Sequence, residues 1–218
     1  MPLRKRTHTT ASDRFPAHHG AKHDQVRRMI AAEAARIMVT QAQFNYRIAK
    51  HKAAERLGAG AHTALPSNAE VESALRAYQA FYGGQQHFTC LQKMRECALR
   101  VMRSLNTFHP RLVGPVLEGT ADLHSRVSLH VFNDPPDAVA VHLLDRGLVF
   151  DNEQRRIRWH DGSYRHVPLL VTNMEDTEVE LNLFNYVDLR QAPPSPVNGC
   201  PQKRAAITEV ECLLAGVC

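Results

Sequence analysis

The chain lacks the features that mark several large classes of protein. Its 218 residues include five cysteines but no C-x-x-C pair, which argues against a disulfide framework or a zinc site. No apolar run approaches the roughly 18 residues that a membrane-spanning helix needs. The basic start also leads into no apolar segment of the kind found in secretory signals. We therefore expect a cytoplasmic protein with no membrane partner.

Signatures of common catalytic and nucleic-acid sites are missing as well. The sequence has no G-x-x-x-x-G-K-[ST], no G-x-G-x-x-G after a predicted strand and no G-x-S-x-G. P-loop ATPase, Rossmann and hydrolase chemistry are disfavoured for that reason. There is no zinc finger, no aromatic RNP motif and no convincing helix-turn-helix, so we expect no sequence-specific recognition of nucleic acid.

What the chain does have is a mild basic excess, with 27 Lys and Arg against 22 Asp and Glu. Much of this excess falls near the start. Residues 1–24 show no hydrophobic periodicity and mix Pro, Ser, Thr and His, so they bury too little surface to offset the entropy of ordering. We expect residues 1–24 to form a disordered basic tail.

The region 25–109 has helical periodicity throughout. One apolar stripe from Val26 to Leu57 predicts a long amphipathic helix or two helices in line. Ser67 and Glu70 form an S-x-x-E capping box ahead of a second helix. Apolar residues in 91–105 step by three and four positions and predict a third helix. We therefore expect about three helices here.

The region 110–218 changes to a period of two, which is typical of strands. We expect about five strands, interrupted by a helix near 134–147 and a D-G hairpin turn at Asp161 and Gly162. The predicted strands cover 112–117, 126–132, 148–159, 164–172 and 178–184. A Pro-rich connector (191–201) precedes a C-terminal helix. The prediction is an α+β fold, with an N-terminal helical segment packed against a mixed sheet.

The segment Leu112–Phe132 is the most informative stretch of the sequence. It reads LVGPVLEGTADLHSRVSLHVF, in which an apolar strand runs into a Gly-Thr turn and Ser125 opens a second strand with alternating faces. This arrangement resembles the core of the nucleotidyltransferase superfamily. In that superfamily, a Gly-Ser at the end of one strand holds nucleotide phosphates, and a Ser-Asp-x-Asp on the next strand binds magnesium.

The resemblance assigns roles to particular residues. Gly119 and Thr120 match the Gly-Ser, and Ser125–Ser128 matches the Ser-Asp-x-Asp. Glu180 matches the third carboxylate, which members of the superfamily carry on a later strand. Such a triad holds two hard cations that neutralise charge on the attacking and leaving oxygens. The resemblance thus implies a nucleotidyltransferase-like fold for region 110–218.

The sequence departs from this pattern at both metal positions of the second strand. Arg126 stands where the first carboxylate belongs, and Ser128 offers only a neutral oxygen where the second belongs. Because a guanidinium repels a divalent cation, we expect the usual metal triad to be absent. Magnesium enters as a cofactor only if catalysis remains.

A second resemblance covers nearly the whole chain after Asp24. A family of bacterial proteins of uncharacterised activity shares the helical lead-in, a similar GTAD-x-HS strand and an APxSPV connector, which is found here at Ala192–Val197. This likeness implies a fold and no particular activity.

Two further sets of residues are candidate sites. Asp122, His124 and His130 offer an oxygen and two imidazoles to a transition metal, although most histidines face solvent or are hydrogen-bonded in a core. Arginines flank the D-G hairpin and, with Arg126, could cradle a phosphate, unless the hairpin is merely exposed. They are Arg155, Arg156, Arg158 and Arg165.

Three hypotheses about function follow. The leading one is a binding or regulatory module that holds a nucleotide or a phosphorylated compound near Gly119, Thr120, Ser125, Arg126 and Ser128. The first alternative is an active nucleotidyl- or phosphoryl-transferase in which Asp122, Glu178 and Glu180 replace the missing ligands. The second alternative is an interaction protein whose helical stripe from Val26 to Leu57 binds a protein partner or a second copy. Common to the first two is the expectation that Arg126 lies close to the acidic strand of Glu180.

Overall fold

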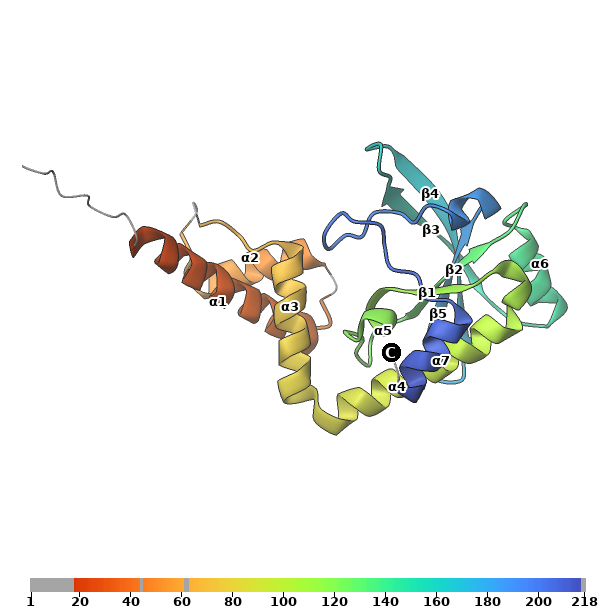
Figure 1. Cartoon of the computed structure of the whole chain (residues 1–218), viewed down its shortest axis with the longest axis horizontal. Helices are drawn as coiled ribbons and strands as arrows, with labels where there is room; N and C mark the ends of the chain where they lie inside the picture. Colours follow the sequence, from red (N-terminus) through yellow and green to blue (C-terminus); the bar gives the residue numbers. More distant parts are fainter. Residues whose placement is uncertain (1–17, 44, 61–62, 217–218) are drawn as a thin grey trace, which may run out of the picture.

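A computed structural model describes residues 18–43, 45–60 and 63–216 (Figure 1). The expected α+β fold is confirmed: the described residues form N-terminal helices followed by a five-stranded mixed sheet with its own helices. In chain order the elements are α1 (His18–Thr40), α2 (Tyr46–Arg56), α3 (Asn68–Tyr78), η1 (Gln79–Gly83), α4 (Gly84–Ser104), η2 (Asn106–Phe108), β1 (Arg111–Val113), α5 (Gly114–Glu118), β2 (Val127–Phe132), α6 (Ala138–Asp145), β3 (Asp151–Arg158), β4 (Tyr164–Met174), β5 (Thr177–Phe184), η3 (Tyr186–Leu189) and α7 (Ile207–Ala215).

The sheet has the strand order β1-β2-β5-β4-β3. Strands β2 and β5 run parallel, and every other neighbouring pair is antiparallel. The parallel register sets Ser128 directly beside Glu180, so two of the residues assigned by the resemblance are neighbours. The D-G turn joins β3 to β4, and Gly162 supplies the positive φ of 82° that this turn requires.

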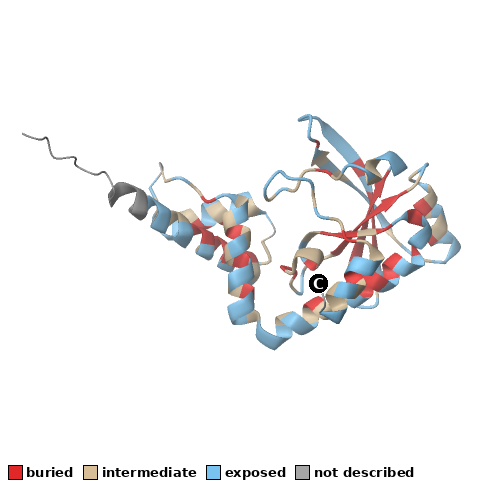
Figure 2. Ribbon diagram, in the orientation of Figure 1, coloured by how far each residue is buried: buried red, intermediate tan, exposed pale blue. Residues whose placement is uncertain are grey.

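Helices α4, α6 and α7 cover one face of the sheet, whereas on the other face Leu189 of η3 packs against a smaller apolar cluster that includes Phe132 and Phe184. Buried residues of α4, α6 and α7 share one core with alternate residues of β2 and β5 (Figure 2). Strand residues in this core include Val127, Leu129, Val131, Val179, Leu181 and Leu183. Because side chains alternate along a strand, the even-numbered residues of β2 and β5 face away from these helices.

The N-terminal helices α1, α2 and α3 form a second, separate apolar core. The chain turns after Thr40, and α2 packs beside α1, so the two helices are not in line as one of the predictions had them. Asn45 caps α2 by accepting hydrogen bonds from the backbone of Arg47 and Ile48. The predicted capping box of α3 is present, with both hydrogen bonds between Ser67 and Glu70 formed.

Among the element boundaries that differ from the predictions, two have a clear physical cause. Strand β1 ends at Val113, because Gly114 (φ 70°) and Pro115 begin the short helix α5 within the run predicted as a strand. Helix α1 begins at His18, so 18–24 is helical, and the rest of the predicted tail lies outside the described residues. A helix held by buried side chains extends outward at the gain of one hydrogen bond per residue, which accounts for the earlier start.

The backbone passes from the helical core to the sheet region through η1, a π-helix between α3 and α4. Gly84 follows with a φ of 48°, and the chain changes direction there, as Figure 1 shows. At Gly83 an added Cβ would lie 2.6 Å from the Cβ of His87, so the bend leaves no room for a side chain. A π-turn and a left-handed glycine together account for this kink.

A polar stripe on α3 and η1 joins the helical core to the sheet region. Asn68, Glu72, Arg76 and Gln79 are spaced by three or four residues and lie on one side of the helix, whereas Val71 and Leu75 are buried in the helical core. The hydrogen bonds to the sheet region run from Asn68 to the carbonyl of Pro196 (2.7 Å), from Arg76 to Glu118 (3.3 Å) and from Gln79 to the carbonyl of Thr120 (2.8 Å).

Glu118 is the most perturbed carboxyl group at this contact. Burial raises its pKa, and a hydrogen bond with Glu72 together with the charge of Glu72 raises it further, to about 7. Arg76 lies 3.4 Å from Glu72 and 3.3 Å from Glu118 and opposes this rise, as does Lys203. At acidic pH Glu118 is therefore protonated, and its proton is shared with Glu72 through their hydrogen bond between α5 and α3.

We expect the contribution of Glu118 to the free energy of unfolding to fall as the pH rises from roughly 5 to 8. The pKa of Glu118 in the folded state lies above its unfolded value, so its contribution is full below about 4.5 and is lost as the pH passes through about 7. The contribution amounts to at most about 3 kcal/mol. Glu118→Gln keeps the hydrogen bond without the charge, so the free energy of unfolding should depend less on pH in this variant. Unfolding in urea at several pH values measures it.

The matched control is Glu96→Gln, which removes one exposed acidic charge from α4. The free energy of unfolding of this variant should depend on pH as that of the unmodified protein does, including the part of the dependence that is due to histidines. If Glu118→Gln gave the same pH curve as Glu96→Gln, the shared proton would play no part in stability.

The described residues contain no helix that is both long enough and apolar enough to cross a membrane.

Candidate functional site

Buried polar residues gather on the face of the sheet opposite α4, α6 and α7. Ser128 and His130 of β2 lie beside Glu180 and Asn182 of β5, and each is at most 7% exposed. The alternation of the two strands places all four on this face, which we call the open face. A group of buried polar side chains on one sheet face costs folding energy, and such groups often mark functional sites.

Arg155 of β3 holds the buried carboxylate of Glu180. The guanidinium makes two parallel bonds, Nη1 to Oε1 at 2.8 Å and Nη2 to Oε2 at 2.7 Å. The side chain of Glu180 is 7% exposed and that of Arg155 is 41% exposed. Burial by itself raises the pKa of Glu180, but hydrogen bonds from Arg155 and Ser128 and the charges of Arg155 and Arg126 bring the pKa below its ordinary value. Glu180 is therefore a carboxylate at neutral pH.

Arg126 lies at the entrance to β2 and contacts the acidic strand, as the sequence predicts. Its Nε donates to Oε2 of Glu178 at 2.6 Å, and its Nη1 lies 3.7 Å from Glu153. The hydrogen bond to Glu178 is the main reason that its pKa is raised. The side chain remains 35% exposed, so one part of the guanidinium faces solvent.

Arg204 covers the other end of the open face. It comes from the connector that precedes α7, and its Nε donates to Nδ1 of His130 at 3.1 Å. Its guanidinium lies 4.9 Å from the ring centre of Phe132 and 5.6 Å from that of Phe184. Burial lowers the pKa of Arg204 to about 10, and burial followed by the charge of Arg204 holds the pKa of His130 well below its usual range. His130 is therefore neutral and accepts a hydrogen bond.

Gly119 and Thr120 lie away from this face, against α4 and η1. Gly119 ends α5 with a φ of 81°, and a Cβ there would lie 3.8 Å from Nη2 of Arg95. Thr120 is buried, and its carbonyl accepts the hydrogen bond from Gln79. The glycine at the end of β1 is instead Gly114, where a Cβ would lie 3.9 Å from that of Ser128. The sequence-based prediction did not identify Gly114 as the glycine at the end of β1, because it treated α5 as part of the strand.

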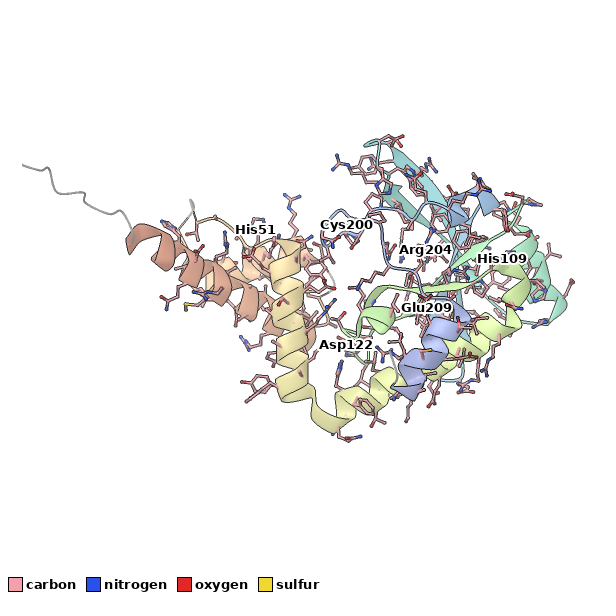
Figure 3. The ribbon with its side chains drawn as sticks, in the orientation of Figure 1. His51, His109, Asp122, Cys200, Arg204 and Glu209 are labelled. Atoms are coloured by element: carbon pink, nitrogen blue, oxygen red, sulfur yellow. The ribbon has the colours of Figure 1, made fainter. Side chains whose placement is uncertain are left out.

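The loop before β2 holds Asp122, His124 and Ser125 in a local network. The carboxylate of Asp122 accepts hydrogen bonds from the hydroxyl of Ser125 (2.8 Å) and the backbone N–H of His124 (3.0 Å). Figure 3 shows Asp122 beside α5, apart from Arg204 on the connector. Among the described residues, no three His, Cys, Asp or Glu side chains could hold a metal ion together. The set Asp122, His124 and His130 is therefore not brought together.

Magnesium does not fit the residues of the open face. Arg126 and Ser128 supply no carboxylate, and the one carboxylate that lies beside Ser128 is already neutralised by Arg155. A hard divalent cation needs several anionic oxygens, and here a guanidinium stands in that place. No catalytic step through a metal can be derived from this arrangement.

Three residues of the site were not singled out from the sequence. In the sequence, Arg155 is one of four hairpin arginines. The only signal that separates it from Arg156 is the alternation of β3, which places neighbouring residues on opposite faces. Asn182 donates to the hydroxyl of Ser128 at 3.3 Å and to the carbonyl of Leu129 at 3.2 Å. Arg204 follows a Pro-rich connector and has no periodic signal.

A groove lies elsewhere, on the side of α4 near the bend. It has a volume of about 1060 Å³ and is lined by residues of η1, α4, the loop before β2 and the β4–β5 turn. Of the predicted site residues, Asp122 alone lines it. Asp122 therefore belongs to this groove, whereas Glu178 and Glu180 belong to the sheet.

Removing the partner of Glu180 should destabilise the protein. Arg155→Ala leaves a buried carboxylate without its cation, and we expect a loss of about 2–3 kcal/mol, less than for a fully buried pair because Arg155 is partly exposed. Adding Glu180→Gln should recover at least half of the loss. Unfolding in urea followed by the fluorescence of Trp159 measures each value.

Arg156→Ala is the control, since Arg156 is the next residue of β3 and stacks on Tyr164, 3.8 Å from the ring centre. It should cost less than about 1 kcal/mol. Equal losses for the two arginine variants would contradict the importance of the ion pair.

Comparison with known proteins identifies no relative of this chain. No family model matches it, and the searches of curated proteins and of solved structures found no significant match. The candidate site therefore rests on the contacts of the chain's own residues, above all on the pair formed by Arg155 and Glu180.

Proposed function

We propose that the open face binds a phosphate-bearing ligand, such as a nucleotide, without a divalent metal, on a nucleotidyltransferase-like core. The observation that carries this proposal is the bidentate pair of Arg155 and Glu180 beside Ser128. It sets a guanidinium where the resemblance implies a metal ion. The module would bind or sense its ligand and would not transfer a group.

Guanidinium groups suit this role because they recognise phosphate oxygens in the same paired geometry as carboxylates. Arg126 and Arg155 are 35% and 41% exposed, so a ligand can reach both from solvent. Each is held by a glutamate, which fixes its direction before a ligand arrives. The ligand must then compete with the more exposed acid, Glu178, for Arg126.

The alternative of an active transferase has weaker support. It requires Asp122, Glu178 and Glu180 to act together, but Asp122 is bonded to Ser125 in the loop. Glu178 is bonded to Arg126, and Glu180 to Arg155. Carboxylates engaged in this way offer few free oxygens to a cation.

The alternative of a partner-binding helical stripe also has weaker support. Ile30, Ala34 and Ile37 of this stripe are completely buried among α1, α2 and α3. They stabilise the helical core, and of the described stripe residues Ile48 and Leu57 remain exposed for a partner. A cytoplasmic location, which the sequence favours, stays part of the proposal.

Calorimetry with ATP, GTP and pyrophosphate tests the function. We expect at least one of them to bind in EDTA, with an affinity that changes less than about twofold when Mg²⁺ is added and that weakens with salt. Arg126→Ala should weaken binding at least about tenfold, which corresponds to 1.4 kcal/mol. Glu178→Gln should strengthen binding, because it removes the competing anion from Arg126.

Arg156→Ala is the charge-matched control, because its side chain lies on the opposite face of β3. It should leave the affinity unchanged within about twofold, a difference well under 1.4 kcal/mol. Absence of binding to all three compounds would refute the proposal. Binding that requires Mg²⁺ and disappears in Glu178→Gln would favour the transferase instead.

A further inference from the structure

Strand β3 forms an open edge of the sheet. The strand order ends at β3, and no described segment pairs with its outer side. It is eight residues long, and six of them are exposed. The outer row of backbone N–H and C=O groups is a template for another strand, and proteins protect such an edge with charged side chains, by interrupting it or by covering it.

The opposite edge shows this protection. Leu112 of β1 exchanges two backbone hydrogen bonds with Ala205 of the connector, each of 2.9 Å. The connector thus covers one edge of the sheet within the chain. Nothing equivalent covers β3 among the residues that the structure describes, so the two edges differ in kind.

The sequence of β3 fits a second copy of itself in one antiparallel register. If two copies pair about a two-fold axis to give one continuous sheet, directly opposed residues point to the same face of that sheet. Because alternate residues of a strand share a face, opposed residues are then both even-numbered or both odd-numbered. The axis therefore passes through a residue. An axis at Gln154 sets Glu153 opposite Arg155 of the second copy, and the same contact occurs twice by symmetry.

Every other central position brings like charges together. An axis at Glu153, Arg155 or Arg156 opposes that residue to itself. An axis at Asn152 opposes two acids (151 and 153), and one at Ile157 opposes two arginines (156 and 158). Like charges directly opposite each other destabilise strand pairing, and unlike charges stabilise it. The register centred on Gln154 is the one that charge permits.

We propose that β3 pairs with β3 of a second copy, about a two-fold axis at Gln154, to form one continuous sheet across a homodimer. The pairing supplies main-chain hydrogen bonds along the edge, and the paired charges select the register. Arg155 then contacts Glu180 of its own chain and Glu153 of the second copy. The dimer contact therefore adjoins the open face and brings an acid from the second copy to it.

Sedimentation over a range of protein concentrations tests the dimer. We expect the full chain to pass from monomer to dimer as its concentration rises. Gln154→Lys sets two lysines against each other at the axis and should raise the dissociation constant at least about tenfold. Gln191→Lys adds the same charge at an exposed position outside β3 and should leave it unchanged. A constant monomer mass for the unmodified protein would overturn the proposal.

Cysteine cross-linking tests the register in a variant with Ser at Cys200, Cys212 and Cys218. Gln154→Cys should form a covalent dimer on oxidation, because opposed Cβ atoms lie about 5 Å apart. Arg156→Cys should not, because the two positions would be about 13 Å apart along the strands. Equal cross-linking at both positions, or at neither, would overturn the register, even if nucleotide binding at the open face were found.

Discussion

The ion pair between Arg155 and Glu180 is the contact on which the open face depends. Glu180 is enclosed between β2 and β4, where an unpaired carboxylate would strongly oppose folding. Arg155 reaches it across β4 from the edge strand, and so joins the hairpin to the centre of the sheet. Three further polar residues can be buried around this pair, because their hydrogen bonds are made within the chain: Ser128, Asn182 and His130. The pair thus lets a polar group persist where an apolar core would otherwise be expected.

The resemblance places metal ligands at positions that carry no carboxylate here, and the charges of the neighbouring residues fit the absence of a metal. An arginine at position 126 would oppose a metal, and Arg155 neutralises the carboxylate that such a metal would have bound. Positive charge on this face therefore comes from fixed guanidinium groups. These groups do not depend on the concentration of a cation, and they remain charged at every physiological pH. Arg126 and Arg155 are each paired with a glutamate, so the proposal of an anionic ligand rests on the exposed parts of these two guanidinium groups.

The core of the N-terminal helices and the main core of the sheet region are joined by polar contacts. Close packing stabilises each core, whereas the stripe of Asn68, Arg76 and Gln79 between them depends on hydrogen bonds and on the protonation of Glu118. Such contacts are more sensitive to pH and salt than apolar packing is. The contact between the two regions is therefore expected to vary with pH and salt more than the packing within each. The edge strand β3 lies in the sheet region, at the end of the strand order.

The sequence by itself determined the features that depend on near neighbours. The capping box at Ser67, the turn at Gly162 and the alternation of β2 and β5 are local, since each rests on side chains or dihedral angles a few residues apart. Tertiary structure decided that α2 returns against α1 and that Arg155, of four similar arginines, meets Glu180. These outcomes join residues as far apart as 25 positions. They depend on the packing of whole elements, which no local pattern encodes.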